Sequence, residues 1–112
     1  MRVALDVVRR FRRGAVAVHI LHHAAEGQVH GAWLTEELAR HGHRLSPGTL
    51  YPLLHRLEDE GLLAGRDDVV DGRVLRRYRA TRQGREALAE LRQVVAELAA
   101  EVAALDRRAT RR

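Results

Sequence analysis

The feature that most restricts the fold of this chain is a well-marked helix that runs directly into a β-hairpin. The Ser-Pro pair at residues 46–47 is typical of a helix start, and Gly61 is typical of a helix end. Two strand-like runs follow at residues 62–66 and 73–81, and the Asp-Gly pair at residues 71–72 between them is a strong signal for a tight turn. A helix followed at once by a two-stranded hairpin favours a winged helix-turn-helix.

Helical periodicity also precedes this unit. Apolar residues recur at helical spacing over residues 3–12 and 15–26, and the helix can continue through Gly14 between them. The second of these runs is apolar almost all round, which predicts burial on more than one side and, in so small a chain, contact with a partner subunit. A shorter helix within residues 30–42 completes the predicted helices before the hairpin.

A long helix with a regular apolar seam is predicted from Thr81 onward. Its apolar residues are spaced three and four apart for almost three heptads, which is the pattern of a coiled coil. The expected dimerisation residues are Leu88, Leu91, Val95, Leu98, Val102 and Leu105. The predicted fold is therefore mainly α within the α+β class. Residues 1–80 form an N-terminal helix and a winged helix-turn-helix, and residues 81–112 form a dimerisation helix with a frayed basic tail.

Composition indicates a basic, folded protein. Hydrophobic residues make up 46% and charged residues 31%, and no apolar run approaches the ~20 residues that span a bilayer. The absence of cysteine excludes disulfides and suits a reducing cytoplasm. All 20 basic residues are arginine, the net charge is +5, and the first 13 residues hold five arginines against one aspartate. Arginine binds phosphate and reads guanine, so this composition suits a nucleic-acid ligand as well as a generally basic protein.

The helix that begins at Ser46 is predicted to present a polar face to DNA. Its leucines, among them Leu50, Leu54 and Leu57, fall on one side and belong to the core. The other side mixes hydroxyl, aromatic, imidazole and guanidinium groups, all of which can reach phosphates or base edges. The expected DNA contacts on this helix are Ser46, Thr49, Tyr51, Pro52, His55 and Arg56. The alternative is a capped surface helix with a solvated polar face.

Five arginines crowd the predicted hairpin, which suits a grip on the minor groove or on phosphates. Acidic residues in the same hairpin weaken its charge, so the arginines after the turn are favoured as contacts. The expected DNA contacts here are Arg73, Arg76 and Arg77. The alternative is a charged edge that resists aggregation, and both roles are compatible.

Three stretches resemble the PadR family of bacterial transcriptional regulators: "HGAWLTEEL", "LSPGTLYPLLHRLEDEGLL" and "GRVLRRYRATRQGREAL". The resemblance covers about residues 14–90 and implies a dimeric winged-helix protein, mostly repressive, whose C-terminal helix packs on the N-terminal helix of the other subunit. It implies the same DNA contacts on the capped helix and around residues 73–77. Two departures stand out. Ala32 replaces the usual aromatic, with Trp33 next, and the basic N-terminal helix is longer than in many relatives.

The histidines raise the question of an effector. His19 and His23 lie one helical turn apart, and His22 is beside them, so the three are candidate ligands for a transition metal. A further ligand could come from His30, His41, His43, Glu26, Glu97 or Glu101. No metal motif of fixed spacing is present, and the alternative is that these are ordinary helical positions. No cofactor is therefore required, and a metal effector stays an open alternative.

The family resemblance implies a second kind of effector site. Some short members hold flat apolar ligands in a pore at the dimer axis, between the first and the last helix. The matching pore residues here are Val18, His22 and Val95. This face has no aromatic residue, and the two-fold axis would place two copies of the histidine in it. An ion, a small polar ligand or no ligand is favoured over a planar apolar one.

These patterns predict a cytoplasmic, DNA-binding transcriptional regulator. The expected partners are double-stranded DNA and a second copy of the chain, with no membrane partner and an unknown effector. The operator is expected to be an inverted repeat with half-site centres ~10 bp apart. The alternative is a winged-helix module that binds proteins without binding DNA. An enzyme is not expected, because no nucleophile–base–acid set or phosphate loop appears.

Overall fold

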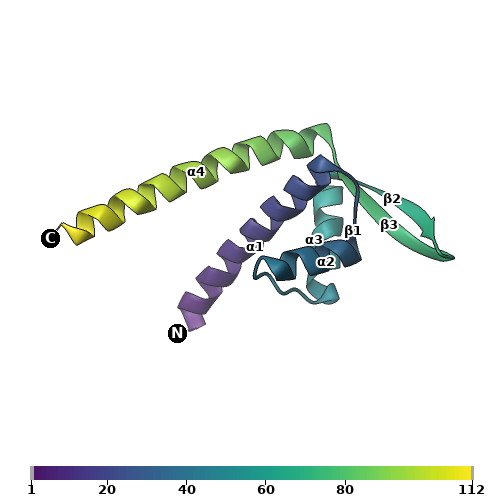
Figure 1. The fold of residues 1–112 in the computed structure, drawn as a ribbon, viewed down its shortest axis with the longest axis horizontal. Coiled ribbons are helices and arrows are strands. Elements are labelled where there is room, and N and C mark those ends of the chain that lie inside the picture. Colours follow the sequence, from purple (N-terminus) through teal and green to yellow (C-terminus); the bar gives the residue numbers. More distant parts are fainter. Residues whose placement is uncertain (1, 112) are drawn as a thin grey trace.

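The structure, a computed structural model, describes the backbone of residues 2–111 and the side chains of residues 5–111. Over these residues the chain forms four helices and one small sheet, and the first and last helices leave the body of the molecule as two diverging arms (Figure 1). The elements are α1 (Arg2–Glu26), β1 (Val29–His30), α2 (Gly31–Arg40), α3 (Pro47–Asp59), β2 (Leu63–Val70), β3 (Arg73–Ala80) and α4 (Arg82–Thr110). The predicted winged helix-turn-helix with a long C-terminal helix is confirmed.

Helix α1 is one continuous helix through Gly14, where an added Cβ would meet no atom within 4 Å. Only its C-terminal half is covered by the rest of the chain. Val16, Ile20 and Leu21 are buried there, whereas every residue from 5 to 14 is exposed. The burial on more than one side that the sequence predicts is thus supplied largely by the chain's own core.

The core lies where the second half of α1 meets α2, α3 and the sheet. Helix α3 contributes the leucines that its periodicity predicts, because Leu50, Leu54 and Leu57 are all buried. Burying each leucine side chain stabilises the fold by about 1.5–3 kcal/mol relative to leaving it in water. This leucine face fixes α3 with its opposite face toward solvent.

The sheet has the antiparallel order β1-β3-β2. The predicted Asp-Gly turn is confirmed: Asp71 and Gly72 both have positive φ, 51° and 76°, as a two-residue hairpin turn of type I′ requires. Strand β2 continues to Val70 and is longer than the predicted run of residues 62–66. Strand β1 was not predicted, because two residues are too few to show an alternating pattern.

Hydrogen bonds and close packing hold the first turn of α4 against the rest of the chain. Thr81 accepts a hydrogen bond from the Gly84 N–H at 3.0 Å and donates one to the Gly61 carbonyl at 2.5 Å. At Gly84 an added Cβ would lie 2.0 Å from the Leu62 carbonyl oxygen, so only glycine fits. Leu88 is buried in this same region. The first residue of the predicted seam is therefore part of its own chain's core.

Beyond Leu91, α4 contributes no further buried residue, and all residues from 92 to 110 are exposed. The molecule measures 63 × 32 × 23 Å, and its radius of gyration of 16.6 Å exceeds the roughly 13 Å of a compact chain of this length. Among residues 2–111, no helix combines the length and apolar character that a membrane span requires.

Candidate nucleic-acid interface

The start of α3 is built as the sequence predicts, with one difference. Ser46 occupies the N-cap position and Pro47 the first helical position, and the Ser46 carbonyl accepts from the N–H groups of Thr49 and Leu50 at 3.0 Å. The Ser46 hydroxyl makes no capping bond and lies instead 3.2 Å from the Thr49 hydroxyl. Pro47 has no N–H and Thr49 already donates to Ser46, so among the described first-turn residues the Gly48 N–H is left to an outside acceptor such as phosphate.

The side of α3 opposite its leucines is open to solvent. All six residues that the sequence places there are exposed: Ser46, Thr49, Tyr51, Pro52, His55 and Arg56. They come together on one continuous face, because the buried leucines hold the helix in a single orientation. No acidic side chain lies within ion-pair distance of Arg56 in the described part of the chain. The face thus offers hydroxyl, imidazole and guanidinium donors to one ligand.

Tyr51 also packs against the chain, a role that the sequence analysis missed. Its ring covers the first residue of α2, where a Cβ on Gly31 would come within 2.7 Å of the ring atom Cε1. The side chain stays 39% exposed. Glycine at position 31 is thus what allows the tyrosine ring to sit between α2 and α3.

The predicted wing contacts fall into two groups. Arg73 is exposed beside the turn and has no carboxylate in ion-pair distance among residues 5–111. Arg76, by contrast, lies 2.7 Å from Glu58 and 2.9 Å from Asp67. Arg77 forms an ion pair with Asp68 and donates a hydrogen bond to Gln28 at 2.8 Å. The structure therefore places two of the three arginines in contacts within the protein.

Glu58 links α3 to the wing. Its carboxylate accepts from Arg76 and, at 3.3 Å, from the Gly65 N–H. The hydrogen bond from Arg76 is the main reason that the pKa of Glu58 falls below its usual value, and the same bond raises the pKa of Arg76. Sequence analysis missed this residue, although an acid near the end of a helix just before a basic hairpin signals such a link. The bridge sets the angle between α3 and the wing.

The outer half of the wing is apolar as well as basic. Val69 and Val74 are cross-strand neighbours and are 71% and 68% exposed. They stand beside Arg73 at the tip, far from the core. The sequence analysis did not select these valines, which lie close to the predicted Asp-Gly turn.

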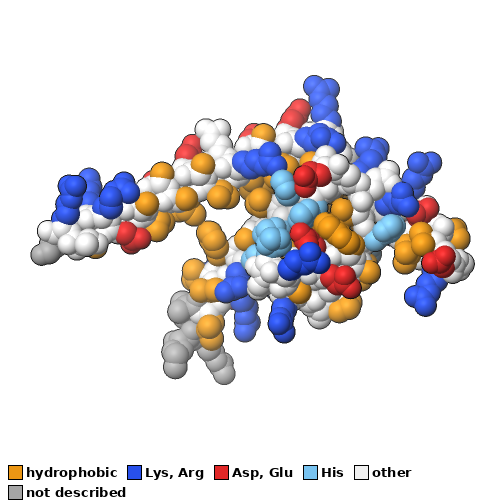
Figure 2. All heavy atoms as spheres, viewed as in Figure 1, with side chains coloured by type: hydrophobic (Ala, Val, Ile, Leu, Met, Phe, Trp, Pro, Cys, Tyr) orange, Lys and Arg blue, Asp and Glu red, His pale blue; other side chains and the backbone are white. Residues whose placement is uncertain are grey.

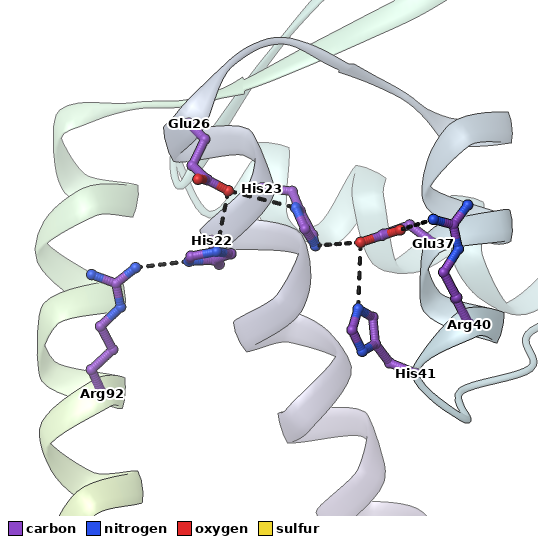
Figure 3. Close-up of polar contacts among 7 residues, drawn as sticks. All are labelled: His22, His23, Glu26, Glu37, Arg40, His41 and Arg92. Carbon is purple, nitrogen blue, oxygen red and sulfur yellow. Dashed lines mark hydrogen bonds and ion pairs between the residues drawn. The ribbon is translucent and has the colours of Figure 1, made fainter.

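Five of the seven histidines gather where α1 meets α2 (Figure 2). His22 and His23 share the Glu26 carboxylate, at 3.1 Å and 3.7 Å, and Figure 3 shows the three side chains converging. One ligand atom from each of these residues lies within 4.8 Å of the others. Arg92 of α4 donates to Nδ1 of His22 at 2.8 Å and so connects this group to the last helix.

His19 lies outside the group formed by His22, His23 and Glu26. Its ring centroid is 5.1 Å from that of His41 and 5.2 Å from that of His43. Burial, followed by repulsion from His43, His41 and the other neighbouring histidines, lowers the pKa of His19. The three histidines of the predicted metal site thus divide into two neighbouring groups.

The predicted pore residues lie on two helices that diverge. Val18 and His22 are half-buried on α1, whereas Val95 is 53% exposed on α4, beyond the last half-buried residue of that helix. One chain alone therefore does not close a pore around these three residues, and the pore stays a prediction about the dimer.

Both arms carry large apolar side chains that are at least 40% exposed in the single chain. On α1 these are Leu5, Val7, Val8 and Phe11, and on α4 they are Val94, Val95, Leu98, Val102 and Leu105. Figure 2 shows hydrophobic side chains along the sides of the arms that face each other. Leu91 is half-buried at the base of this surface.

The chain matches known regulators over most of its length. The sequence profile of the family described as "Transcriptional regulator PadR-like family" matches residues 20–90. The chain is 64% identical over 95 residues to "Transcriptional regulator Rv3488" of Mycobacterium tuberculosis, which covers 85% of this chain and 89% of that protein. A PadR family regulator from Eggerthella lenta superposes with a TM-score of 0.79 at 33% identity, over 93% of this chain and 92% of that one. A PadR-like regulator from Bacillus cereus gives 0.73 at 27% identity, over 89% and 95%.

Proposed function

The chain belongs to the PadR-like family of transcriptional regulators, and from that premise we propose that it is a homodimer that binds double-stranded DNA and represses transcription. It is a regulator and not an enzyme. The observation that carries the proposal is the open polar face of α3, which is held away from the core and carries Arg56 without an acidic partner among the described residues.

Helix α3 is the element that would enter the major groove. An α-helix fits that groove, and Arg56 can donate two hydrogen bonds to one guanine. The Thr49 hydroxyl, together with the Gly48 N–H, suits a phosphate oxygen. Pro52 offers an apolar surface to a thymine methyl or a sugar. The helix would then combine positioning contacts at its start with base contacts one to two turns further on.

The wing would contact the adjacent minor groove through its tip. Arg73 supplies the charge, and Val69 and Val74 supply apolar contact with sugars. Arg76 and Arg77 are already held by acids, so their contribution would be to keep the wing at a fixed angle to α3. Two arginines that the sequence predicts as DNA contacts would thus have a structural role in the wing.

A second copy of the chain would cover the apolar sides of the two arms. Among residues 5–111, a monomer would leave nine large hydrophobic side chains of α1 and α4 exposed to water, and contiguous patches of that kind mark association surfaces. The seam from Leu91 to Leu105 has coiled-coil spacing, so a partner helix can pack along it. Two-fold symmetry would then present two copies of α3 to successive major grooves ~34–36 Å apart.

Arg56→Ala tests the DNA-binding face. Fluorescence anisotropy would be measured on a duplex obtained by selection from a random library, with a scrambled duplex as control. We expect the variant to bind the selected duplex more weakly by roughly 5- to 150-fold per half-site, because a two-pronged arginine–guanine contact is worth about 1–3 kcal/mol, and the two half-site losses multiply in the dimer. Arg108→Ala, at the far end of α4, removes the same charge and should leave the affinity unchanged.

Two outcomes of this experiment would contradict the proposal. Binding by Arg56→Ala that is as tight as wild type would remove that residue from the interface. Failure of the wild type to bind any duplex, at low as well as at high salt, would favour the alternative of a winged-helix module that binds proteins.

We further propose that a transition-metal ion acts as the effector at His22, His23 and Glu26. Their ligand atoms lie within 4.8 Å of one another, as a shared cation requires. The Arg92 guanidinium can only donate, so Nδ1 of His22 must accept, and the proton of the neutral ring then sits on Nε2. Metal bound at Nε2 would move that proton to Nδ1 and break the contact with Arg92. The ion would thus loosen the junction of α1 with the helix that carries the seam.

Calorimetric titration with zinc chloride tests this site. We expect the wild type to bind about one zinc per chain, His22→Ala with His23→Ala to abolish binding, and Arg92→Ala to tighten it because a competing contact is lost. His30→Ala is the matched control, since His30 lies beside Asp68 on the sheet. Zinc binding that survives the double substitution would show that the ion is held elsewhere.

A further inference from the structure

A groove with a volume of about 750 Å³ runs between the N-terminal half of α1 and the start of α3. Its sides come from three segments: the exposed half of α1, the loop before α3 and the first three turns of α3. Its floor is apolar and includes Val16, Leu45 and Leu53. Five arginines line it: Arg9, Arg12, Arg13, Arg44 and Arg56.

The charge of this groove is not balanced within the chain. No acidic residue lines it, and none of its five guanidinium groups has a carboxylate within 4.0 Å among residues 5–111. Arg10 differs, since it lies 3.5 Å from Asp6 on another side of the same helix. Gathering like charges without partners works against the compact state. An anionic ligand would remove that cost.

The arginines continue a face of α1 that elsewhere packs on the core. Arg9, Arg12 and Arg13 precede Val16 and Ile20 by helical spacing, and these two apolar residues are 2% and 0% exposed. The face changes from apolar to basic at the point where α1 leaves the body. Val8 and Phe11, which belong to the apolar surface of the arms, follow a separate stripe. The basic face is thus separate from the stripe of Val8 and Phe11, and the two surfaces meet at Leu5, one helical turn before Arg9.

The groove opens onto the DNA-facing side of α3. Thr49, Pro52 and Arg56 line the groove and also belong to the exposed face of α3 described above. A ligand that meets this face and extends past the start of α3 therefore passes directly along Arg13, Arg12 and Arg9. Guanidinium groups bind phosphate oxygens through paired hydrogen bonds, and an exposed row of them matches a backbone that repeats its charge.

We propose that Arg9, Arg12, Arg13 and Arg44 bind the phosphate backbone of the DNA that flanks the groove entered by α3. The inference rests on the proposed function, since it extends the same interface. These contacts add affinity and salt dependence but carry no sequence information, because phosphates are the same at every base pair. The N-terminal half of α1 then serves two ligands, a second protein copy on one face and DNA on the other.

The salt dependence of binding measures these contacts. Each neutralised phosphate contributes roughly 0.9 to the slope of log affinity against log salt concentration. We expect Arg9→Gln/Arg12→Gln/Arg13→Gln to lower that slope by about 2.7 per chain, or about 5 per dimer, on a fluorescent random-sequence duplex of about 40 bp between about 50 and 200 mM salt. The ratio of affinities for selected and random DNA should stay unchanged.

The matched control is Arg107→Gln/Arg108→Gln/Arg111→Gln, which removes the same charge from the far end of α4. Its slope should stay close to that of the wild type. Equal losses in the two triple variants would show an effect of net charge alone and would overturn the inference. An unchanged slope in the α1 variant would overturn it too, and if Arg56→Ala still weakens binding, the proposed function would survive.

Two further measurements exclude other occupants. Analytical ultracentrifugation of the α1 variant should show a dimer, and a monomer would mean that these arginines hold the partner chain and not DNA. Inorganic tripolyphosphate serves as a small anionic probe of the groove. An α1 variant that loses tripolyphosphate binding while keeping the wild-type salt slope on DNA would assign the groove to a soluble polyphosphate, and this would overturn the DNA assignment.

Discussion

The two ends of α4 differ in what covers them. At the inner end, Gly84 and Leu88 are buried against the body of their own chain. At the outer end, Leu98 and Leu105 are 40% and 62% exposed, although they continue the same seam. One chain therefore buries the core of the winged unit by itself but leaves the apolar side chains of its two arms exposed. The heptad pattern in a sequence thus does not show which of its residues are buried within one chain and which are left exposed.

A substitution at the inner end of α4 should have the largest effect, which is a loss of folding stability. In Gly84→Ala the new methyl group would lie 2.0 Å from the Leu62 carbonyl oxygen, so α4 would have to shift and give up part of its buried contact. We expect a loss of stability on the order of 3 kcal/mol, seen as a lower midpoint of thermal unfolding. Gly14→Ala, where an added Cβ meets nothing, should be neutral or stabilising by up to about 1 kcal/mol. A Gly84→Ala variant as stable as wild type would show that the inner end is not tightly docked.

At the outer end, substitution should break the dimer and leave the fold intact. Leu98→Asp with Val102→Asp places two charges on the proposed contact surface, where both residues are exposed in the single chain. Analytical ultracentrifugation should show a monomer whose far-ultraviolet circular dichroism still reports a helical protein. DNA affinity should fall at least tenfold, because two linked half-sites become one. A dimer that survives both charges would place the interface elsewhere.

A change of pH should have a smaller effect on stability, which acts through the histidine cluster. Burial lowers the pKa of His19 from its ordinary value of 6.5, so the unfolded chain takes up this proton at a higher pH than the folded chain. The stabilising contribution of neutral His19 is complete above pH 6.5 and is lost as the pH falls below that value. We expect His19→Gln to flatten the pH dependence of the urea midpoint below pH 6.5. His30→Gln, on the sheet, should keep the wild-type profile.

Local patterns in the sequence were sufficient to predict most of the elements. The leucines of α3, the Asp-Gly turn and the long last helix all follow from neighbours in the chain, and the structure confirms them. The bridge from Glu58 to Arg76 joins residues 18 positions apart, and the hydrogen bond from Arg92 to His22 joins residues 70 positions apart. Such pairs arise only when elements pack together, so residue spacing does not disclose them. For the same reason, the sequence alone did not distinguish the arginines that pair with carboxylates from those that have no carboxylate partner among the described residues.

Hydroxyl-radical footprinting on a duplex selected by the wild-type protein tests the central claim most directly. The account predicts two protected patches with centres ~10 bp apart on an inverted repeat, because a two-fold dimer presents two copies of α3 on one side of the helix. A single protected patch, or no protection at concentrations that saturate binding, would contradict a dimeric regulator that reads DNA through α3.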